Sequence, residues 1–421
     1  MEKRELERDK NYVLVEYAFD EDEIKKAEER AVRRLNRIVE VPGFRKGRVP
    51  KGVLKMRLGK DFDYYVLEEL EREIFQMERR ENLLLKPLIV DEKLEDGKAI
   101  VRIEYHHEPD VELPNPEDAV LRIAKKEPVL EKYVDKRLRD LREEHALVEP
   151  KDEPAQVGDL VRVRMKVTTK DGKVLRDEEY EYVLVEGDKR PFVQELIGKK
   201  AGDVVEFDRE YEGKTFHYEM EVLQVYSRTL MELDDEFART VSGEFDTLEK
   251  LKSALMEEGE KIYEVERKNA LRNQALAWLA ENSKLVISEK TIERLVESAI
   301  EKIKEDGKYE EYLEKFESEE NLRDTLKSHY IEDLKGEYSV KGYAKKNDIQ
   351  VGEEEVMEEA EALSQLWGIS PQRAKALVKN DPELRYEIEW TLLKNKVADD
   401  IISKAKIEEF EPEEGEDEKD E

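Results

Sequence analysis

The hydrophobic residues of this chain change their spacing several times, and these changes predict a multidomain α+β fold. Alternate residues from Val13 to Phe19 are apolar, as in a strand with one buried face. From Ile24 to Ile38 the apolar residues recur at helical spacing. Alternation returns over 161–167, and helical spacing dominates after residue 246. Hydrophobic residues make up 38% of the chain and charged residues 43%. This balance favours several small cores over one large core.

The first hundred residues predict a small α+β domain. Asp20 is placed to cap a helix, and Glu23 stands at the position that completes a capping box. Pro87 is expected to end a later helix. The expected elements are a strand at 11–19, a helix after Asp20, a short helix from Pro50 through Leu58, a longer helix that carries Phe62 to Met77, and strands at 88–90 and 98–105 around an Asp96-Gly97 turn.

The middle of the chain predicts a β-rich module with one short helix. Three prolines indicate a linker over 109–118, and the apolar stripe after it predicts a helix from about 128 to 147. The module's expected elements are strands around 161–167, 180–185, 203–211 and 215–226, turns at Asp171-Gly172 and Glu212-Gly213, and a short helix that carries Phe192, Val193, Leu196 and Ile197.

The chain beyond residue 246 predicts a helical domain followed by an acidic tail. Apolar residues from Val356 to Trp367 form one helical stripe, and Ser370-Pro371 and Asp381-Pro382 have the form of helix starts, with an N-cap followed by proline. Residues 408–421 contain ten acids and one lysine, which predicts a solvated, disordered tail.

Positive charge is concentrated near the N-terminus of a chain whose net charge is −32. The 28 residues from Arg33 to Lys60 contain ten basic residues and one acid, Glu40, a net of +9. This concentration predicts a docking site for an anionic partner, and ribosomal RNA is the strongest candidate. The ten basic residues are Arg33, Arg34, Arg37, Arg45, Lys46, Arg48, Lys51, Lys55, Arg57 and Lys60.

The octapeptide GFRKGRVP, residues 43–50, lies at the centre of this basic patch. Its two glycines permit positive φ and a tight exposed loop. Phe44 stands among cations and outside any helical stripe, which suits a partner that offers both phosphates and an apolar cleft. The alternative is an ordinary interhelix loop whose Phe44 packs into its own core. The candidate docking residues are Gly43, Phe44, Arg45, Lys46, Gly47 and Arg48.

Enzymatic and membrane functions find little support. The chain has no cysteine and no phosphate-binding GxxxxGK[ST] loop, and its five histidines form no metal-ligand motif. No nucleophile–His–acid set can be assembled either. From these absent motifs together we expect no metal, cofactor or nucleotide. No secretory signal and no apolar run near 20 residues is visible, which predicts a cytoplasmic protein. The abundance of Glu, Lys and Arg without Cys is typical of heat-adapted proteins.

The octapeptide and the Arg57-Leu58-Gly59 that follows it resemble the ribosome-docking loop of the trigger factor family of bacterial chaperones, with Arg48 in place of a lysine. The resemblance implies an ATP-independent chaperone that shields nascent chains at the tunnel exit of the large ribosomal subunit, where the loop touches a protein and ribosomal RNA. Weak homodimerisation off the ribosome stays open. The implied parts are a ribosome-binding α+β domain (1–112), a linker and helix that belong with the C-terminal domain (113–149), an FKBP-like prolyl isomerase domain (150–227), a helical cradle with arm-like extensions (228–410) and a disordered acidic tail (411–421).

The resemblance extends to a prolyl pocket in the middle module. Such a pocket needs aromatic apolar walls that favour the twisted amide, and no nucleophile. Two of its positions lack the family's usual aromatics, the stretch KRPFVQ alters a turn, and the flap is cut to Glu212-Gly213-Lys214. We therefore expect weak isomerase activity at most, and a mainly structural or client-binding module; a plain β core is the alternative. The pocket candidates are Met165, Leu175, Tyr182, Phe192 and Tyr218.

The helical domain offers candidate cradle residues for unfolded clients, although most stripe residues are expected in helix–helix cores. Two other functions remain open: a dedicated FKBP-type prolyl isomerase, and an RNA-binding protein that uses the patch 33–60. The acidic total and the lack of interleaved aromatics disfavour the latter. The candidate cradle residues are Trp278, Leu279, Tyr309, Tyr312, Phe316, Tyr330, Tyr343 and Trp367.

Overall fold

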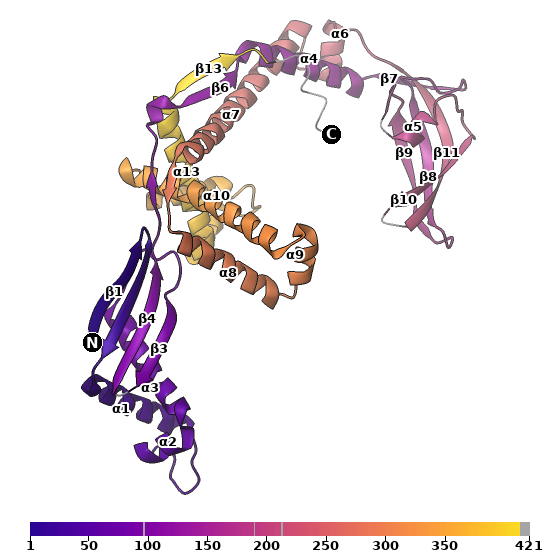
Figure 1. Ribbon diagram of the computed structural model, residues 1–421. Coiled ribbons are helices and arrows are strands. Elements are labelled where there is room, and N and C mark those ends of the chain that lie inside the picture. The colour runs from indigo at the N-terminus through magenta and orange to yellow at the C-terminus, as the bar shows by residue number, and fades with distance from the viewer. Residues whose placement is uncertain (96, 189, 212–213, 413–421) are drawn as a thin grey trace. The chain divides into compact units, whose positions relative to one another are not determined.

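The computed structural model describes residues 1–95, 97–188, 190–211 and 214–412 (Figure 1). The fold is multidomain α+β, as predicted. The chain forms two compact units, one that joins residues 1–122 to 269–408 and one that joins 123–268 to the chain from Glu409. The five-part division expected from the sequence stays a prediction.

The elements of the first unit begin with a sheet and three helices and continue with a helical part. They are β1 (Glu2–Asp9), β2 (Tyr12–Phe19), α1 (Glu21–Ile38), α2 (Lys51–Leu58), α3 (Lys60–Met77), β3 (Leu88–Glu95), β4 (Lys98–His106), β5 (Asp110–Glu112), η1 (Pro116–Asp118), β12 (Lys284–Val286), α8 (Glu289–Glu305), α9 (Tyr309–Phe316), α10 (Glu319–Lys346), α11 (Glu353–Leu363), α12 (Pro371–Asn380) and α13 (Pro382–Lys404).

The second unit consists of a helical segment and a β-rich module. Its elements are α4 (Lys126–Glu144), β7 (Leu147–Lys151), β8 (Leu160–Thr169), β9 (Val174–Val183), α5 (Pro191–Gln194), β10 (Val204–Tyr211), β11 (Lys214–Thr229) and α6 (Asp235–Val241). The chain crosses between the units within β6 (Val120–Ala124), α7 (Leu248–Asn282) and β13 (Lys406–Phe410).

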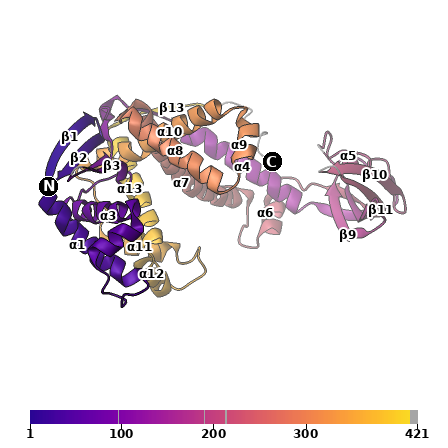
Figure 2. The ribbon, with the colours of Figure 1, turned by 60° about the horizontal axis from the view of Figure 1, so that its bottom comes forward.

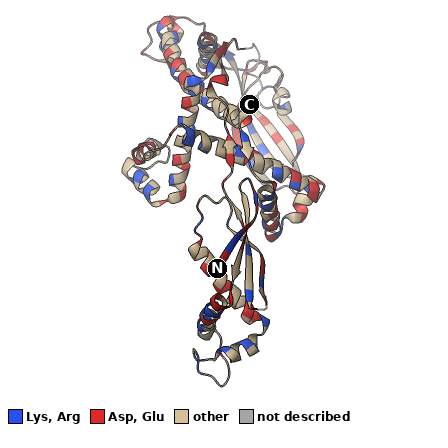
Figure 3. Ribbon diagram, turned by 60° about the vertical axis from the view of Figure 1, so that its left-hand side comes forward, with Lys and Arg blue, Asp and Glu red and all other residues tan. Residues whose placement is uncertain are grey.

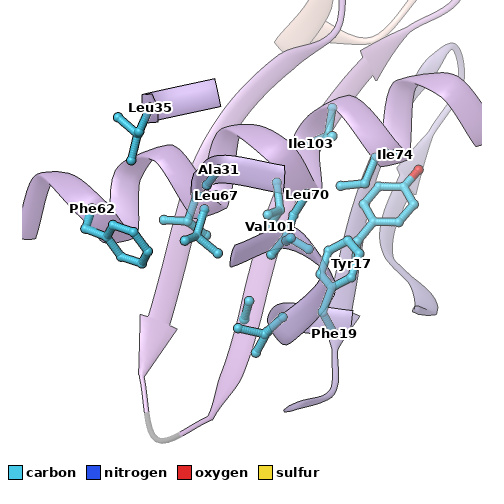
Figure 4. Close-up of a cluster of buried hydrophobic side chains, with 14 of the residues drawn as sticks. Tyr17, Phe19, Ala31, Leu35, Phe62, Leu67, Leu70, Ile74, Val101 and Ile103 are labelled. Atoms are coloured by element: carbon cyan, nitrogen blue, oxygen red, sulfur yellow. The ribbon is translucent and has the colours of Figure 1, made fainter. Parts of the chain in front are cut away.

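The N-terminal sheet has the antiparallel order β1-β2-β4-β3, and α1 and α3 pack against it. The alternation in β2 buries every second side chain, as predicted. Asp20 and Glu23 form the predicted capping box at the start of α1. Figure 4 shows Phe62, Leu70 and Ile74 of α3 among the buried side chains between helices and sheet. This core fixes the two ends of the segment that carries the octapeptide.

The β-rich module has the strand order β10-β11-β8-β9, with β7 also paired to β11. Its core includes alternate residues of β8, three residues of β11, and Val193 and Leu196 around α5. In the helical part, α8 and α10 lie side by side and bury Ile292, Val296 and Tyr338 between them (Figures 1 and 2). Ser370 and Asp381 cap α12 and α13, as predicted.

The structure corrects two expectations about where helices end. Helix α3 ends at Met77, ten residues before Pro87. The chain between these two residues is extended in part, since Leu83 forms a β-bridge with His107, the residue directly after β4. Helix α4 ends at Glu144 rather than near 147, since Leu147 begins β7, which pairs with β11.

The acidic C-terminal stretch was expected to be disordered from residue 408. Residues 408–410 instead belong to strand β13, and the backbone N–H of Lys125 donates to Phe410 O at 2.9 Å. The expected linker 109–118 contains β5, which pairs with β12. The predicted turns at Asp96-Gly97 and Glu212-Gly213, and the tail from 413, lie wholly or partly outside the described residues. Among the described residues, no helix combines the length and the apolar character that a membrane span requires.

Candidate functional site

The candidate docking loop, residues 42–48 and called the docking loop below, is held between two buried valines. Val41 and Val49 are 8% and 3% exposed and belong to the N-terminal core. Gly43 and Gly47 adopt φ values of 89° and 86°, which confirms the predicted use of positive φ. The loop is therefore a short excursion with fixed ends and two turns that favour glycine.

Asn36, in the last part of α1, binds the backbone where the loop ends. The Val49 N–H donates to Asn36 Oδ1 at 2.7 Å, and Asn36 Nδ2 donates to Val49 O at 3.0 Å. Both residues are buried, so these two bonds satisfy groups that water does not reach. The sequence analysis missed Asn36. The available signal was a polar residue directly after Leu35 of the buried stripe.

The Phe44 ring is exposed at the loop tip. The residue is 42% exposed, so the alternative in which it packs into its own core does not hold. Among the described residues, Arg45 and Arg48 have no ion pair and no side-chain hydrogen bond, whereas Lys46 pairs with Glu40 at 3.2 Å. The loop thus presents an aromatic ring and two uncommitted guanidinium groups to a partner.

The basic patch divides into paired and unpaired cations. Arg34 pairs with Glu68 at 2.6 Å, and Lys51 and Lys55 both pair with Glu28 of α1. Figure 3 shows lysines and arginines on α2. The remaining members of the patch form no ion pair with any residue that the structure describes; they are Arg33, Arg37, Arg45, Arg48, Arg57 and Lys60.

A row of aromatic rings crosses the β-rich module. Phe192 contacts Tyr182 edge-on, with ring centroids 5.7 Å apart, and stacks on Phe207 at 5.6 Å. Phe207 in turn stacks on Tyr218 at 4.9 Å, its register partner across β10 and β11. Three of the five pocket candidates therefore lie in one row. The sequence analysis missed Phe207, although it stands two residues after Val205 and so lies on the same face of the predicted strand.

Of the other two pocket candidates, one lies in the core beneath this row and one lies apart from it. Met165 is 6% exposed and pairs across the sheet with Met220, so it belongs to the module's core. Leu175 is 51% exposed and stands outside that core cluster. The structure brings together Tyr182, Phe192 and Tyr218 but not all five candidates, and the prolyl pocket stays a prediction.

The turn before α5 carries a charged pair next to this aromatic row. Hydrogen bonds from the Arg190 side chain and backbone lower the pKa of Asp188 to about 2. The Arg190 guanidinium lies 5.4 Å from the centroid of the Tyr182 ring. Arg190 of the altered KRPFVQ stretch is therefore held near the Tyr182 ring. Lys189 of that stretch lies outside the described residues.

The candidate cradle residues also divide. Leu279 and Tyr343 are 0% and 1% exposed, so they form helix–helix core and cannot line a client surface. The remaining six are partly buried and stay candidates; they are Trp278, Tyr309, Tyr312, Phe316, Tyr330 and Trp367.

Comparisons with known proteins extend over nearly the whole chain. Two family models match it: bacterial trigger factor protein over residues 1–141, and the C-terminus of bacterial trigger factor protein over 247–403. A curated trigger factor from Thermotoga maritima is 48% identical over 412 residues, which cover 98% of this chain and 97% of that protein. The chain belongs to the trigger factor family.

Further relatives agree. Trigger factor from Kosmotoga olearia is 43% identical over 413 residues, which cover 97% of this chain and 94% of that protein. A solved structure described as "Promiscuous Substrate Recognition in Folding and Assembly Activities of the Trigger Factor Chaperone" is 48% identical and matches with a TM-score of 0.77. That match covers 96% of this chain and 99% of the solved chain. The sequence resemblance to trigger factors is therefore confirmed.

Proposed function

We propose that this trigger factor family member is an ATP-independent cytoplasmic chaperone that docks at the tunnel exit of the large ribosomal subunit and shields nascent chains. The loop 42–48 supports this function best. Its Phe44 is 42% exposed, and Arg45 and Arg48 have no side-chain partner among the described residues. Because the loop ends are held in the core, docking has to order the exposed side chains of the loop but not its ends.

The contacts available to the loop are sufficient for reversible docking. Burying the exposed part of Phe44 contributes about 1–2 kcal/mol. Each charge-assisted hydrogen bond from Arg45 or Arg48 contributes roughly 1.5–3 kcal/mol before ordering costs. Micromolar binding requires about 8 kcal/mol in total, which these groups and their neighbours can approach. Clients that bind with similarly modest affinity can leave by dissociation, without nucleotide hydrolysis.

Ribosome co-sedimentation tests the docking loop. The test variant replaces Phe44, Arg45 and Lys46 together by alanine. We expect the folded variant to lose most of its binding, since it loses the exposed ring and two of the loop's cations. Unchanged pelleting of this variant would remove the assignment. Binding to free RNA as strong as binding to ribosomes at the same salt concentration would favour an RNA-binding protein instead.

A matched control comes from the β10–β11 hairpin. Arg209, Tyr211 and Lys214 are all exposed there, so replacing the three by alanine also removes one aromatic residue and two positive charges. We expect this control to pellet with ribosomes as well as the wild type. The same measurements in ATP-free buffer check the absence of a nucleotide requirement, and sedimentation velocity of the free protein checks for a weak homodimer.

The aromatic row in the β-rich module supports a second, weaker activity. Phe192, Phe207 and Tyr218 stack in sequence, which gives an apolar surface for a proline ring. Met165 and Leu175 are not aromatic, so they add no aromatic wall to this surface. We therefore expect slow turnover of a proline-containing tetrapeptide. A rate comparable to that of a dedicated isomerase would instead favour the enzyme as the main function.

A further inference from the structure

The first residues of α8 are held by the β1–β2 turn, residues 9–12, which belongs to the same compact unit. Ser288 is the N-cap residue of α8, yet its side chain does not cap its own helix. Its hydroxyl instead donates to Asp9 Oδ2 at 2.6 Å, and its N–H donates to Asn11 Oδ1 at 2.8 Å. A turn of the N-terminal sheet therefore supplies the partners, including a carboxylate, that a helix N-terminus favours.

His106, the last residue of β4, is part of this contact. The Thr291 hydroxyl of α8 donates to Asn11 Oδ1 at 3.3 Å and lies 3.0 Å from His106 Nδ1. Because the single hydroxyl proton goes to Asn11, Nδ1 of His106 is the donor to Thr291. The other ring nitrogen, Nε2, is buried without a hydrogen-bond partner among the described residues. His106 and Thr291 are 1% and 0% exposed, so a proton on Nε2 would place a positive charge where water is excluded.

The charged and titratable groups around His106 oppose its protonation on balance. Burial lowers the pKa of His106, and Arg294 of α8 and the neighbouring His107 lower it further. Glu104 acts in the opposite direction, but its Oε2 lies 3.8 Å from Nε2, and its other oxygen already accepts a hydrogen bond from the Tyr12 hydroxyl at 2.8 Å. The Tyr12 ring, whose centroid lies 5.4 Å from that of His106, is uncharged. A ring exposed to water would therefore take up a proton more readily than the buried ring.

Further contacts between the β1–β2 hairpin and the start of α8 are also polar. Lys290 Nζ of α8 pairs with Glu7 at 2.6 Å, and Lys10 Nζ donates to Ile287 O at 2.8 Å. Such groups regain water as a partner when they separate. β5 pairs with β12, which ends two residues before Ser288, and this pairing holds the two chain segments together. The start of α8 can therefore leave the turn while β12 stays on β5.

We propose that the β1–β2 turn and the start of α8 form an acid-sensitive latch, which is closed while His106 is neutral and opens when His106 is protonated. The closed latch holds α8 against the N-terminal sheet. This inference goes beyond the proposed function, because it requires neither a ribosome nor a client. The closed latch takes up a proton less readily than the open latch, so it is most stable above pH 6.5 and weakens as the pH falls below that value. The latch residues are Asp9, Asn11, His106, Ser288 and Thr291.

Hydrogen exchange of the full chain tests the latch at the Ser288 amide, whose N–H is bonded to Asn11 while the latch is closed. If only the open latch binds the proton, with a pKa of about 6.5, the opening constant rises about tenfold between pH 7.5 and 5.5. We therefore expect the protection factor of Ser288, corrected for the intrinsic exchange rate at each pH, to fall roughly three- to tenfold over this range. Amides of β2 should keep their protection factors, since the sheet itself does not open.

Three variants assign the pH dependence. His106→Gln removes the titrating ring, so the protection of Ser288 should no longer change with pH. His107→Gln is the matched control, because it removes the neighbouring histidine, whose Nε2 lies 3.3 Å from Arg80 Nη1. This control should keep the wild-type fall. Arg294→Gln removes a cation that disfavours protonation of His106, so it should reduce the fall, and it keeps the test available if His106→Gln does not fold.

Distances between two spin labels show whether α8 moves. The chain has no cysteine, so Arg4→Cys on β1 and Lys302→Cys on α8, both at exposed positions, place one label on each side of the latch. We expect one distance population at pH 7.5 and a second population at pH 5.5 that is absent in His106→Gln. A single population at both pH values, equal protection of Ser288, or an unchanged fall in His106→Gln would overturn the inference. Loss of protection in β2 together with Ser288 would also overturn it, since that result indicates global unfolding.

Discussion

Replacing Asn36 by alanine should loosen the docking loop without altering any residue of the loop itself. The variant removes both hydrogen bonds between the Asn36 side chain and the Val49 backbone, of 2.7 and 3.0 Å. Val49 is 3% exposed, so its N–H and C=O cannot reach water unless the chain moves. Each buried polar group left unpaired costs roughly 1–3 kcal/mol. We therefore expect a local destabilisation of about 2–4 kcal/mol, since relaxation of the loop recovers part of the loss.

Hydrogen exchange of the full chain measures this effect locally. A loss of about 2 kcal/mol corresponds to roughly thirtyfold faster exchange of the Val49 amide. Asn36→Asp is the matched control, because its carboxylate still accepts from the Val49 N–H but cannot donate to Val49 O. It should therefore give intermediate exchange. Equal exchange of residues 43–50 in wild type and Asn36→Ala would show that the loop does not depend on Asn36, and the reasoning would be refuted.

Three further predictions concern stability. Burial raises the pKa of Glu71 to about 8, so the folded protein keeps a proton that the unfolded chain loses near 4.5. Stability should fall as pH rises between these values, and thermal midpoints at pH 5 and 8 should show that Glu71→Gln reduces this fall. Burial lowers the pKa of His106 from 6.5, so stability should fall as the solution becomes more acidic than that value; urea midpoints at pH 7.5 and 5.5 should differ less in His106→Gln. A Cβ on Gly342 would meet Val111 Cγ1 at 2.4 Å, so Gly342→Ala should cost about 1–3 kcal/mol in urea unfolding, partly restored by adding Val111→Ala.

The elements that the sequence predicted correctly are those that bury one face. β2 and α1 carry clear apolar periods, and the Asp20 capping box marks the start of α1. β1 has no such signal, because its sequence EKRELERD is charged and exposed nearly throughout. It is an edge strand whose backbone pairs with β2, and backbone pairing leaves no hydrophobic pattern. Long-range pairing likewise places residues 408–410 in β13, where the acidic composition indicated disorder.

The sequence predicted some features of the candidate sites and not others, because local residue patterns are visible in a sequence and long-range pairing is not. The exposed Phe44 and the two positive-φ glycines followed from local residue types. Asn36 gave only a weak signal, a polar residue beside the buried stripe of α1, because its partner Val49 is 13 residues away and binds through backbone atoms. In the β-rich module, the position of Leu175 depends on a register shift between β8 and β9 near Val167, which strand alternation alone does not reveal.

Charge shows most clearly what the fold adds to the sequence. Arg33 and Arg34 are neighbours in α1, but Arg34 reaches Glu68 of α3 at 2.6 Å while Arg33 has no ion pair among the described residues. The helix turns successive side chains by about 100°, so one guanidinium reaches α3 while its neighbour is left exposed. A net charge summed along the sequence counts both equally. Only cations that the fold leaves unpaired can bind a new anion without first breaking a bond to their own protein, so the contribution of each cation to docking should follow its pairing and not its position in the sequence.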